Sequence, residues 1–494
     1  MLDARILSHL VTPVLAVAVL GGATPARAME PSQGPNLLII CADQWRGQAL
    51  GFLEQEPVLT PNLDRLAAES LVLTHAVSNY PVCSPYRAML MTGIYPHANG
   101  VLGNCNSTGT RYGYELRREA RCWSDVLDDR GYSLGYVGKW HLEAPRKPYV
   151  ESYNNSEKFA WNEWTPPARR HGFRFWYAYN TFDRHLTPEY WASDSRRDQR
   201  VRVEQWGPEH EADVAVQFIR NEDGKHREAT KPFSLVVSMN PPHMPYRLVP
   251  EKYVDRYKDK SVEELLGSRP NLLPPENRWG EYTRKNIKYQ YAMMTGVDEQ
   301  IGRILKSLDE IGERENTIVV FTSDHGDCLG LHGMISKNNH FEESMRIPLL
   351  VRWPEKINSR TDDLLISVPD VYPTLMELMG FTNDVPSNVE GTSYARLFRG
   401  EKMKRPSSQL YMWVSHGQPS RGRRGIRTHR FTLMIERRQG EADRMILHDN
   451  KLDPYQLKNI AGDRPGIVAQ LIDEELNPWL KRTSDPWLSD ETPD

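Results

Sequence analysis

The sequence predicts an α/β fold in which helices cover both faces of a large, mainly parallel sheet. Short apolar or β-branched runs bounded by Gly, Pro or polar residues are typical of buried strands, and they occur at 36–41, 133–137, 233–239, 317–321 and 348–351. Helical patterns lie between or after these runs, at 61–70, 281–311 and 369–379. Strands that alternate with helices favour parallel pairing, because each helix returns the chain to the same end of the sheet.

A second, smaller part of the chain begins near residue 391. Its apolar runs predict a small antiparallel sheet followed by one helix, with strands at 410–414, 425–436 and 444–448 and the helix at 465–480. We therefore expect an α+β subdomain at 391–494. The larger α/β domain is expected at 29–390, with an insertion rich in aromatic and basic residues at 144–211.

The first 28 residues have the pattern of a signal peptide. Arg5 precedes an apolar run at 10–20, and Ala26-Arg27-Ala28 forms a small-x-small cleavage signal. The alternative is an uncleaved anchor, but an apolar run of about 11 residues is shorter than the ~20 that a membrane helix needs. We expect export to the periplasm or the medium, with cleavage after Ala28 and no membrane span afterwards.

Charge and cysteine content narrow the class of protein. The 494 residues include 62 basic and 65 acidic side chains, a net charge of -3, so the overall balance does not indicate a partner such as nucleic acid or a membrane surface. An exported chain with five cysteines is expected to pair some of them. If Cys83 is reserved for chemistry, Cys105 and Cys122 are the nearest pair that a disulfide could join.

Polar side chains follow four of the predicted strands. They are Asp43 and Gln44, Lys139 and His141, Asn240 and His243, and Asp324 and His325. Each taken alone has a plain alternative, as a helix cap, a loop histidine or a surface charge. Because ligands of α/β sheets bind beyond the carboxyl ends of the strands, we expect these residues to meet in one site.

The residue types indicate a metal and an oxyanion. Asp43, Gln44 and Asp324 supply the oxygen ligands that hard divalent cations such as Ca²⁺ prefer. Three cationic side chains would surround the metal, namely Arg87, Lys139 and Lys337. Such a pocket suits a sulfuryl or phosphoryl group. Cys83, between polar neighbours at a predicted helix start, occupies a reactive position.

Five segments resemble, in order, the motifs of the type I sulfatases of the alkaline-phosphatase-like superfamily. They are "CSPYRAMLMTG", "GKWH", "PPHMPY", "SDHGD" and "SKNNHFEESMRIPLL". The resemblance runs from residue 36 to about 479. It implies that a formylglycine-generating maturation enzyme converts Cys83 to Cα-formylglycine. One hydroxyl of the hydrated aldehyde would attack sulfur and release the alcohol, and the second would then expel sulfate.

The resemblance also implies a ligand set for one Ca²⁺. Its members are Asp43, Gln44, Asp324 and His325, together with residue 83. Many relatives have Asp at position 44 and Asn at position 325. The substitutions in this chain lower the ligand charge, and Ca²⁺ remains the expectation.

The remaining catalytic roles are carried over in the same way. Arg87 is similar to the arginine that steadies the diol, and His141 resembles the residue that takes its proton. Lys139 and Lys337 look like clamps for the sulfate. Either Lys337 or His243 would protonate the leaving oxygen.

The insertion predicts the substrate class. Aromatic faces stack on sugars and arginines bind sulfates, and the insertion supplies Trp176, Tyr179, Arg184 and His185. The alternative for each aromatic residue is an ordinary core position. The basic run at 421–425 would contact a polyanion at the rim of the site, or it is a solvated turn.

The function expected is hydrolysis of sulfate esters on a sulfated carbohydrate. A phosphodiesterase or phosphonate monoester hydrolase of the same superfamily could use nearly the same site. An N-sulfate hydrolase would differ only in the leaving atom. A third alternative is an exported glycan-binding protein with an inactive site, in which Cys83 stays a thiol.

Overall fold

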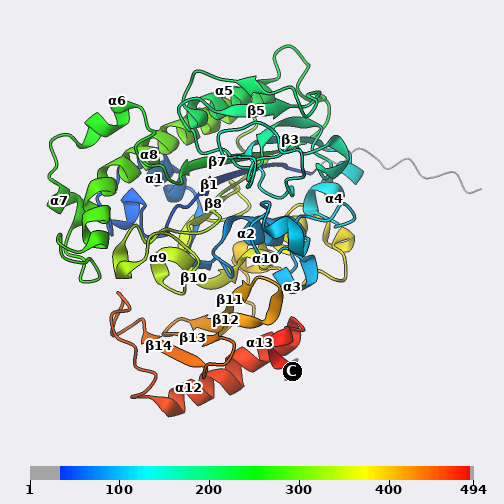
Figure 1. Ribbon diagram of the computed structural model, residues 1–494. Helices are drawn as coiled ribbons and strands as arrows, with labels where there is room; N and C mark the ends of the chain where they lie inside the picture. The colour runs from blue at the N-terminus through cyan, green and yellow to red at the C-terminus, as the bar shows by residue number, and fades with distance from the viewer. Residues whose placement is uncertain (1–33, 490–494) are drawn as a thin grey trace, which may run out of the picture. The chain divides into compact units, whose positions relative to one another are not determined.

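The larger of two sheets in the computed structural model, which describes residues 34–489, has ten strands in the order β10-β2-β9-β8-β1-β7-β3-β4-β5-β6 (Figure 1). Their bounds are β1 (Asn36–Asp43), β2 (Leu71–Val77), β3 (Ser133–Lys139), β4 (Phe175–Tyr179), β5 (Glu189–Ala192), β6 (Val201–Arg202), β7 (Phe233–Pro242), β8 (Thr317–Ser323), β9 (Leu349–Arg352) and β10 (Arg360–Ser367). The predicted signal peptide lies outside the described residues.

The central strands confirm the predicted parallel sheet. β8, β1, β7, β3 and β4 pair parallel in that order, and β10 pairs parallel with β2. β9 runs antiparallel to both of its neighbours, and β5 and β6 add antiparallel pairs at one edge. The sequence prediction missed β2 and β10. It also assigned few strands to the insertion, which in fact supplies β4, β5 and β6.

Helices cover both faces of this sheet. The helices of the described residues, of which α12 and α13 belong to the C-terminal part, are α1 (Pro61–Ala68), α2 (Cys83–Thr92), α3 (Pro96–Asn99), α4 (Trp123–Asp129), α5 (Gly207–Arg220), α6 (Glu251–Val254), α7 (Val262–Leu266), α8 (Arg278–Glu310), α9 (Glu342–Met345), α10 (Val368–Leu378), α11 (Ala395–Phe398), α12 (Pro465–Leu471) and α13 (Asn477–Arg482). None of the described helices is long and apolar enough to cross a membrane.

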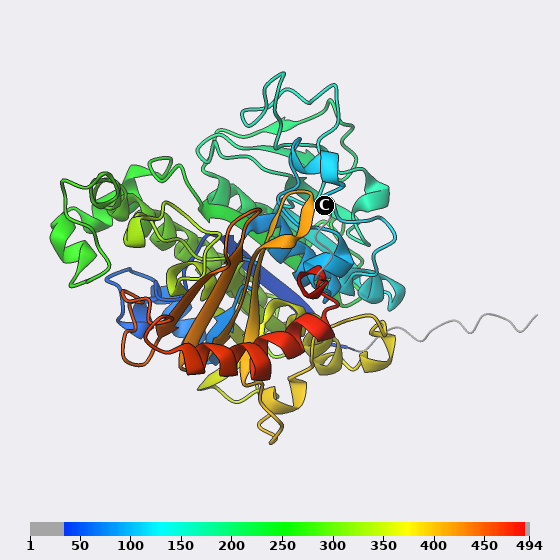
Figure 2. The ribbon, with the colours of Figure 1, turned by 60° about the horizontal axis from the view of Figure 1, so that its bottom comes forward.

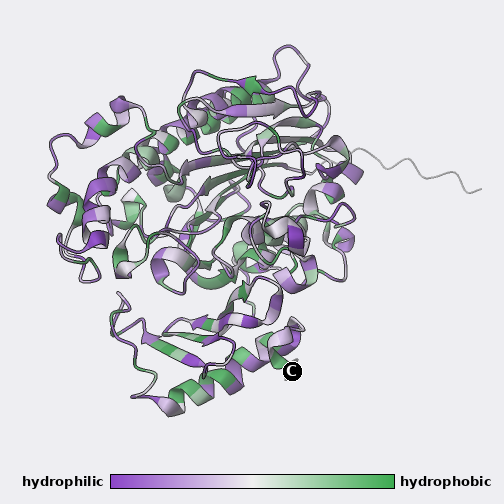
Figure 3. Cartoon of the chain, in the orientation of Figure 1, coloured by the Kyte–Doolittle hydropathy of each residue, from purple (hydrophilic) through white to green (hydrophobic). Residues whose placement is uncertain are grey.

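The side-chain alternation of β1 explains the two layers. Leu37 and Ile39 pack into one core cluster with α2, α4 and α10, whereas Leu38 and Ile40 pack into another with α1, α5 and α8. Figure 1 shows α5 and α8 on the opposite side of the sheet from α2 and α10. In Figure 3 hydrophobic residues concentrate in the central strands, as expected for a sheet buried on both faces.

The C-terminal sheet has four antiparallel strands, not the three predicted. They are β11 (Ser408–Ser415), β12 (Gln418–Thr428), β13 (Phe431–Arg437) and β14 (Arg444–Asp449). The single strand expected at 425–436 is wrong, because the chain turns at the exposed residues His429 and Arg430. α12 and α13, joined by a π turn, cross one face of this sheet (Figure 2).

The two sheets share one core within a single compact unit. Leu410 and Met412 of β11 belong to the same hydrophobic cluster as Ile366 of β10. The Gln409 side-chain amide also donates to the carbonyl of Leu365 at 2.8 Å. The smaller sheet is therefore packed continuously against the larger one.

The basic run at 421–425 contains a buried arginine and is not wholly exposed. Arg424 is fully buried, and its guanidinium donates to both carboxylate oxygens of Asp485 at 2.6 and 3.0 Å. This pair ties β12 to the end of the described chain. Both alternatives given for the run, a polyanion contact and a solvated turn, are wrong for Arg424, because it lies in β12 and its side chain does not reach the surface.

Replacing Arg424 by Met should lower the free energy of unfolding by roughly 3–5 kcal/mol, because it leaves the buried Asp485 carboxylate without its partner. Chemical denaturation would measure the change. Arg421→Met is the matched control, since Arg421 is only half-buried. Equal denaturation midpoints for the two variants would contradict a structural role for the pair.

The predicted disulfide is also wrong. Cys105 and Cys122 are both free thiols and both fully buried. Cys122 lies at the N-cap of α4, where its backbone N–H bonds to Asp125, and the Cys105 N–H bonds to Ser84. The two cysteines are therefore anchored by different partners, and no disulfide joins them. Burial raises the pKa of both thiols.

Alkylation of the denatured protein without a reductant should label Cys105 and Cys122 completely. The label should be absent from native protein, because both sulfurs are buried in a close-packed interior. Peptide mass spectrometry would measure both states. A linked Cys105–Cys122 peptide in an unreduced digest would contradict the structure.

Candidate active site

Four neighbouring strands of the large sheet deliver the polar residues that the sequence singled out. β8, β1, β7 and β3 are adjacent and parallel, so their carboxyl ends lie at one edge. Asp43 ends β1, Lys139 ends β3, and Asp324 follows β8. All three side chains are fully buried. These residues are far apart in the sequence, but they lie together because the strands that carry them are neighbours in the sheet.

Cys83 is the first residue of α2 and points into this cluster. Its sulfur lies 3.3 Å from Nε2 of His325, 3.4 Å from Nζ of Lys337 and 4.0 Å from Nζ of Lys139. α2 can begin here because Pro85 falls in the first turn, where a backbone N–H has no helical partner to lose. Ser84 fixes the start by donating to the carbonyl of His141 at 2.7 Å.

Four side chains form a group that could hold a metal ion. Ligand atoms of Asp43, Cys83, Asp324 and His325 all lie within 4.8 Å of one another, and all four residues are buried. Nδ1 of His325 donates to the carbonyl of Gly326 at 2.9 Å, so its Nε2 is the free acceptor that faces Cys83. Carboxylate and imidazole ligands arranged in this way suit a divalent cation.

Gln44 is oriented by residues that the sequence prediction did not name. Its amide nitrogen donates to the Tyr246 hydroxyl at 3.1 Å, and that hydroxyl donates to Asp327 at 2.5 Å. The amide oxygen therefore faces the site, where Lys337 donates to it at 2.9 Å. A carboxylate at position 44 would have no donor to offer Tyr246. The motifs "PPHMPY" and "SDHGD" contain Tyr246 and Asp327, so the signal was present in the sequence.

Cations compensate the buried carboxylates. Arg87 donates through one nitrogen to Asp43 and to Asp324, each at 3.1 Å, and Lys139 lies 2.7 Å from Asp43. Burial raises the pKa of Asp43, but Lys139 and its neighbours outweigh it and hold that pKa well below the usual range. Burial and the charge of Asp43 raise the pKa of Asp324 to about 7. This pair of like charges is what a bound dication would stabilise.

His141 is a buried imidazole without a hydrogen-bond partner among the described residues. It is 1 % exposed, and neither ring nitrogen is satisfied. Its backbone has φ 54°, a left-handed conformation that non-glycine residues adopt at a cost. Burying an unsatisfied polar group is unfavourable, so this ring points to a ligand that the site is built to receive.

His243 lies at the side of the cluster. Its Nδ1 donates to the carbonyl of Met244 at 2.7 Å and lies 3.5 Å from Asp183. Asn240, which follows the same strand-end pattern, accepts from Lys139 at 3.0 Å. The side chains of β7 thus support the site from one side.

The structure corrects most of the predicted sugar contacts. Trp176, Tyr179 and His185 are only 2–3 % exposed, so none offers a face to a sugar. The Trp176 ring stacks on Tyr136, and the Tyr179 hydroxyl donates to Glu211 at 3.2 Å. Nε2 of His185 donates to the carbonyl of His243 at 2.9 Å. Their place in β4 and the turn after it puts them in the core, because the insertion extends the sheet.

Arg184 is the exception among the four predicted contacts. Its side chain is exposed, beside the buried His185. It lines a hollow of about 400 Å³ together with Tyr153, Phe182 and Arg202. Of the four, only Arg184 stays a candidate for substrate binding.

Comparison with known proteins shows where the chain belongs. Residues 35–381 match the family model described as sulfatase, and residues 330–482 match that described as N-sulphoglucosamine sulphohydrolase, C-terminal. The chain belongs to the sulfatase family. Its large sheet, helical layers and small antiparallel sheet are accordingly the alkaline-phosphatase-like fold, as the sequence predicts.

Curated relatives extend this result to nearly the full length of this sulfatase. It is 39 % identical to an endo-4-O-sulfatase of Bacteroides thetaiotaomicron, over 96 % of this chain and 97 % of the relative. It is 33 % identical to a ulvan-active sulfatase of Formosa agariphila, over 93 % and 83 %. A solved structure of a putative sulfatase from Bacteroides fragilis matches with a TM-score of 0.88 and 47 % identity, over 94 % and 98 %.

A divalent cation should raise the thermal unfolding midpoint of this sulfatase, because it binds only the folded cluster; at 100 times the dissociation constant it adds about 2.7 kcal/mol. Asp324→Asn should remove most of that shift. Differential scanning fluorimetry with Ca²⁺, Mg²⁺ and Mn²⁺ would measure it.

Asp309→Asn is the matched control for that measurement, since Asp309 is half exposed on α8. The comparison uses the shift on adding the cation, so any change in the basal midpoint of a variant cancels. An unchanged shift in Asp324→Asn would contradict a metal site here.

Proposed function

We propose that this protein hydrolyses sulfate esters on a sulfated carbohydrate, with a formylglycine derived from Cys83 as nucleophile. The observation that carries the proposal is the position of Cys83, at the start of α2, within 4.0 Å of His325, Lys337 and Lys139. A plain thiol surrounded by metal ligands and cations has no structural task, since it forms no disulfide. Membership of the sulfatase family supports the same reaction.

The cofactor proposed is one Ca²⁺, held by Asp43, Gln44, Asp324 and His325 together with residue 83. The fit rests on the donor set, which is mostly oxygen and buried, and on the ligand atoms of Asp43, Cys83, Asp324 and His325, which lie within 4.8 Å of one another. When bound, the ion would supply a positive charge that polarises the sulfate oxygens. A formylglycine-generating enzyme is the partner that the modification requires.

The cationic side chains would bind and orient the sulfate. Lys139 and Lys337 each approach residue 83, at 4.0 and 3.4 Å, so together they can hold the oxygens of a bound sulfate. Arg87, paired with both carboxylates, would keep those ligands ionised and in place. The unsatisfied His141 ring would accept a proton from a hydroxyl on residue 83.

Lys337 is the better candidate for the acid that protonates the leaving oxygen. Its ammonium lies 3.4 Å from the Cys83 sulfur, whereas Nδ1 of His243 is engaged by the carbonyl of Met244. Geometry therefore favours Lys337, with His243 as a contact for the sugar beside the sulfate. This choice goes beyond the sequence, which left both open.

A sulfated polysaccharide or oligosaccharide is the proposed substrate class. One relative is named for endo action on a 4-O-sulfate and another for action on ulvan, and these names support a sulfated carbohydrate as the substrate of this chain. The similarity of residues 330–482 to the N-sulphoglucosamine sulphohydrolase C-terminal model makes an N-sulfate the second candidate. The pattern of residues 1–28 supports export, to the periplasm or the medium.

The mass of the peptide that contains Cys83 tests the nucleophile. Protein made with a formylglycine-generating enzyme should lose roughly 18 Da at this position and gain sulfatase activity together with the loss. Cys83→Ala should be inactive under both conditions. Protein made with that enzyme whose Cys83 remains an unmodified thiol would refute the mechanism, and if it also lacks activity it would favour the glycan-binding alternative.

Relative rates on matched esters would then decide between the related reactions. We expect a 4-O-sulfated oligosaccharide to be turned over faster than an N-sulfated one, and faster than phosphate mono- or diesters or a phosphonate monoester. Size analysis of a polymeric substrate would separate endo from exo action. A preference for phosphorus esters would overturn the proposal.

A further inference from the structure

The backbone that carries Lys337 belongs to no described helix or strand. It lies between the short helix that ends at Gly333 and the start of α9 at Glu342. The Lys337 ammonium nevertheless lies 2.9 Å from Gln44 and 3.4 Å from Cys83. A lysine stem is long and flexible, so its head group keeps one position only where the backbone beneath it is fixed.

Two hydrogen bonds hold the next residue, Asn338, from opposite sides. Its N–H donates to the carbonyl of Pro81, two residues before Cys83, at 3.0 Å. Its carbonyl accepts from Nη1 of Arg423 in β12, also at 3.0 Å. Asn338 has φ 68°, a left-handed conformation that asparagine adopts more readily than other non-glycine residues, so the residue suits this turn.

Arg423 is itself fixed within the C-terminal sheet. Its Nε donates to Glu436, its register partner on β13, at 2.9 Å, and its guanidinium lies 5.0 Å from the centre of the Trp413 ring. A guanidinium can bind a carboxylate with one nitrogen and a carbonyl with another, which a lysine ammonium cannot do in the same geometry. The side chain thus links the sheet rigidly to Asn338.

Further contacts attach the same segment to the C-terminal sheet. Nε2 of His340 lies 3.2 Å from Nε2 of His448 on β14, and Glu342 accepts two hydrogen bonds from Arg427 at 2.9 and 3.0 Å. Burial disfavours the charge of Glu342, but Arg427 more than offsets it and holds the pKa of Glu342 at about 2. The pair therefore stays ionised at neutral pH.

We propose that Arg423 is a positioning residue, through which the C-terminal sheet aligns Lys337 against residue 83. The inference rests on the role of Lys337 given under the proposed function. Among its hydrogen bonds in the described structure, Arg423 makes none to Cys83 or to the Lys337 ammonium, so it acts through the backbone of Asn338. The basic run that the sequence offered as a substrate contact or a plain turn would thus have a third role.

Arg423→Met should lower kcat about 10- to 100-fold with little change in KM, because a misplaced catalytic group loses that much. The loss should be greater on a sugar sulfate than on 4-nitrophenyl sulfate, whose leaving oxygen needs no proton. Arg438→Met is the matched control. Arg438 donates to the other oxygen of Glu436 at 3.0 Å and is more than half exposed. It should leave both rates unchanged.

A double-mutant cycle with Lys337→Ala separates positioning from a general loss of structure. Arg423→Met should have almost no further effect in the Lys337→Ala background, since the residue that it aligns is gone. Equal losses in both backgrounds, or an unchanged kcat, would overturn the proposal. Where Arg423→Met lowers the unfolding midpoint, Arg423→Lys, which keeps a cation beside Glu436, takes its place in the cycle.

The cycle also distinguishes the positioning role of Arg423 from the catalytic role of Lys337 on which it rests. A fully active Lys337→Ala variant would refute the role of Lys337 in the reaction and the positioning of Lys337 with it. An inactive Lys337→Ala variant beside a fully active Arg423→Met variant would refute only the positioning.

Discussion

The architecture of the site depends on the compensation of two buried carboxylates, Asp43 and Asp324. Both are fully removed from water, where an uncompensated charge is strongly unfavourable. Arg87 reaches both of them with one nitrogen, and Lys139 adds a second cation beside Asp43. The carboxylates repel each other as well, so the same arrangement that requires these cations also favours a divalent ion.

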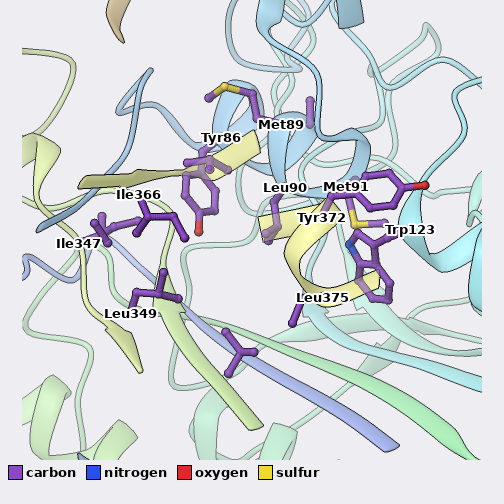
Figure 4. Packing of buried hydrophobic residues seen from close by; sticks show 14 of the residues in the cluster. Tyr86, Met89, Leu90, Met91, Trp123, Ile347, Leu349, Ile366, Tyr372 and Leu375 are labelled. Carbon is purple, nitrogen blue, oxygen red and sulfur yellow. The ribbon is translucent and has the colours of Figure 1, made fainter. Parts of the chain in front are cut away.

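The helix that supplies Arg87 also supplies Cys83, the proposed nucleophile, so its packing links the core to the candidate site. Figure 4 shows Leu90 and Met91 of α2 close to Tyr372 and Trp123, which belong to the same core cluster. These contacts fix the helix, and the hydrogen bond from Ser84 to the carbonyl of His141 fixes its first turn against β3. Cys83 and Arg87 therefore keep their places because apolar side chains one and two turns away are buried.

Residues that touch no reacting atom set the orientation of those that do. Tyr246 and Asp327 orient the Gln44 amide so that its oxygen, and not its nitrogen, faces Lys337. On the other side, Pro81 and Arg423 hold the backbone next to Lys337. Both arrangements join parts of the chain that are far apart in sequence, and outer contacts of this kind tune the ligands of many metal sites.

The parallel core of the sheet and the residues that meet at its edge can be predicted from the sequence alone. Apolar runs buried on both faces and ending in polar residues have few other interpretations, so Asp43, Lys139, Asp324 and His325 were predicted together. The motifs determined Cys83 in the same way. The apolar runs, the polar residues that follow them and the motifs are each made of neighbouring residues, so they can be read directly from the sequence.

Which aromatic and basic side chains face solvent depends instead on the three-dimensional packing of the chain. Trp176 and Tyr179 became core residues because β4 pairs with β3, and Arg424 became a buried ion pair because the chain's end returns to β12. The free thiols of Cys105 and Cys122 were likewise decided by packing. Burial depends on which distant segments cover a side chain, and neither composition nor spacing along the chain carries that information.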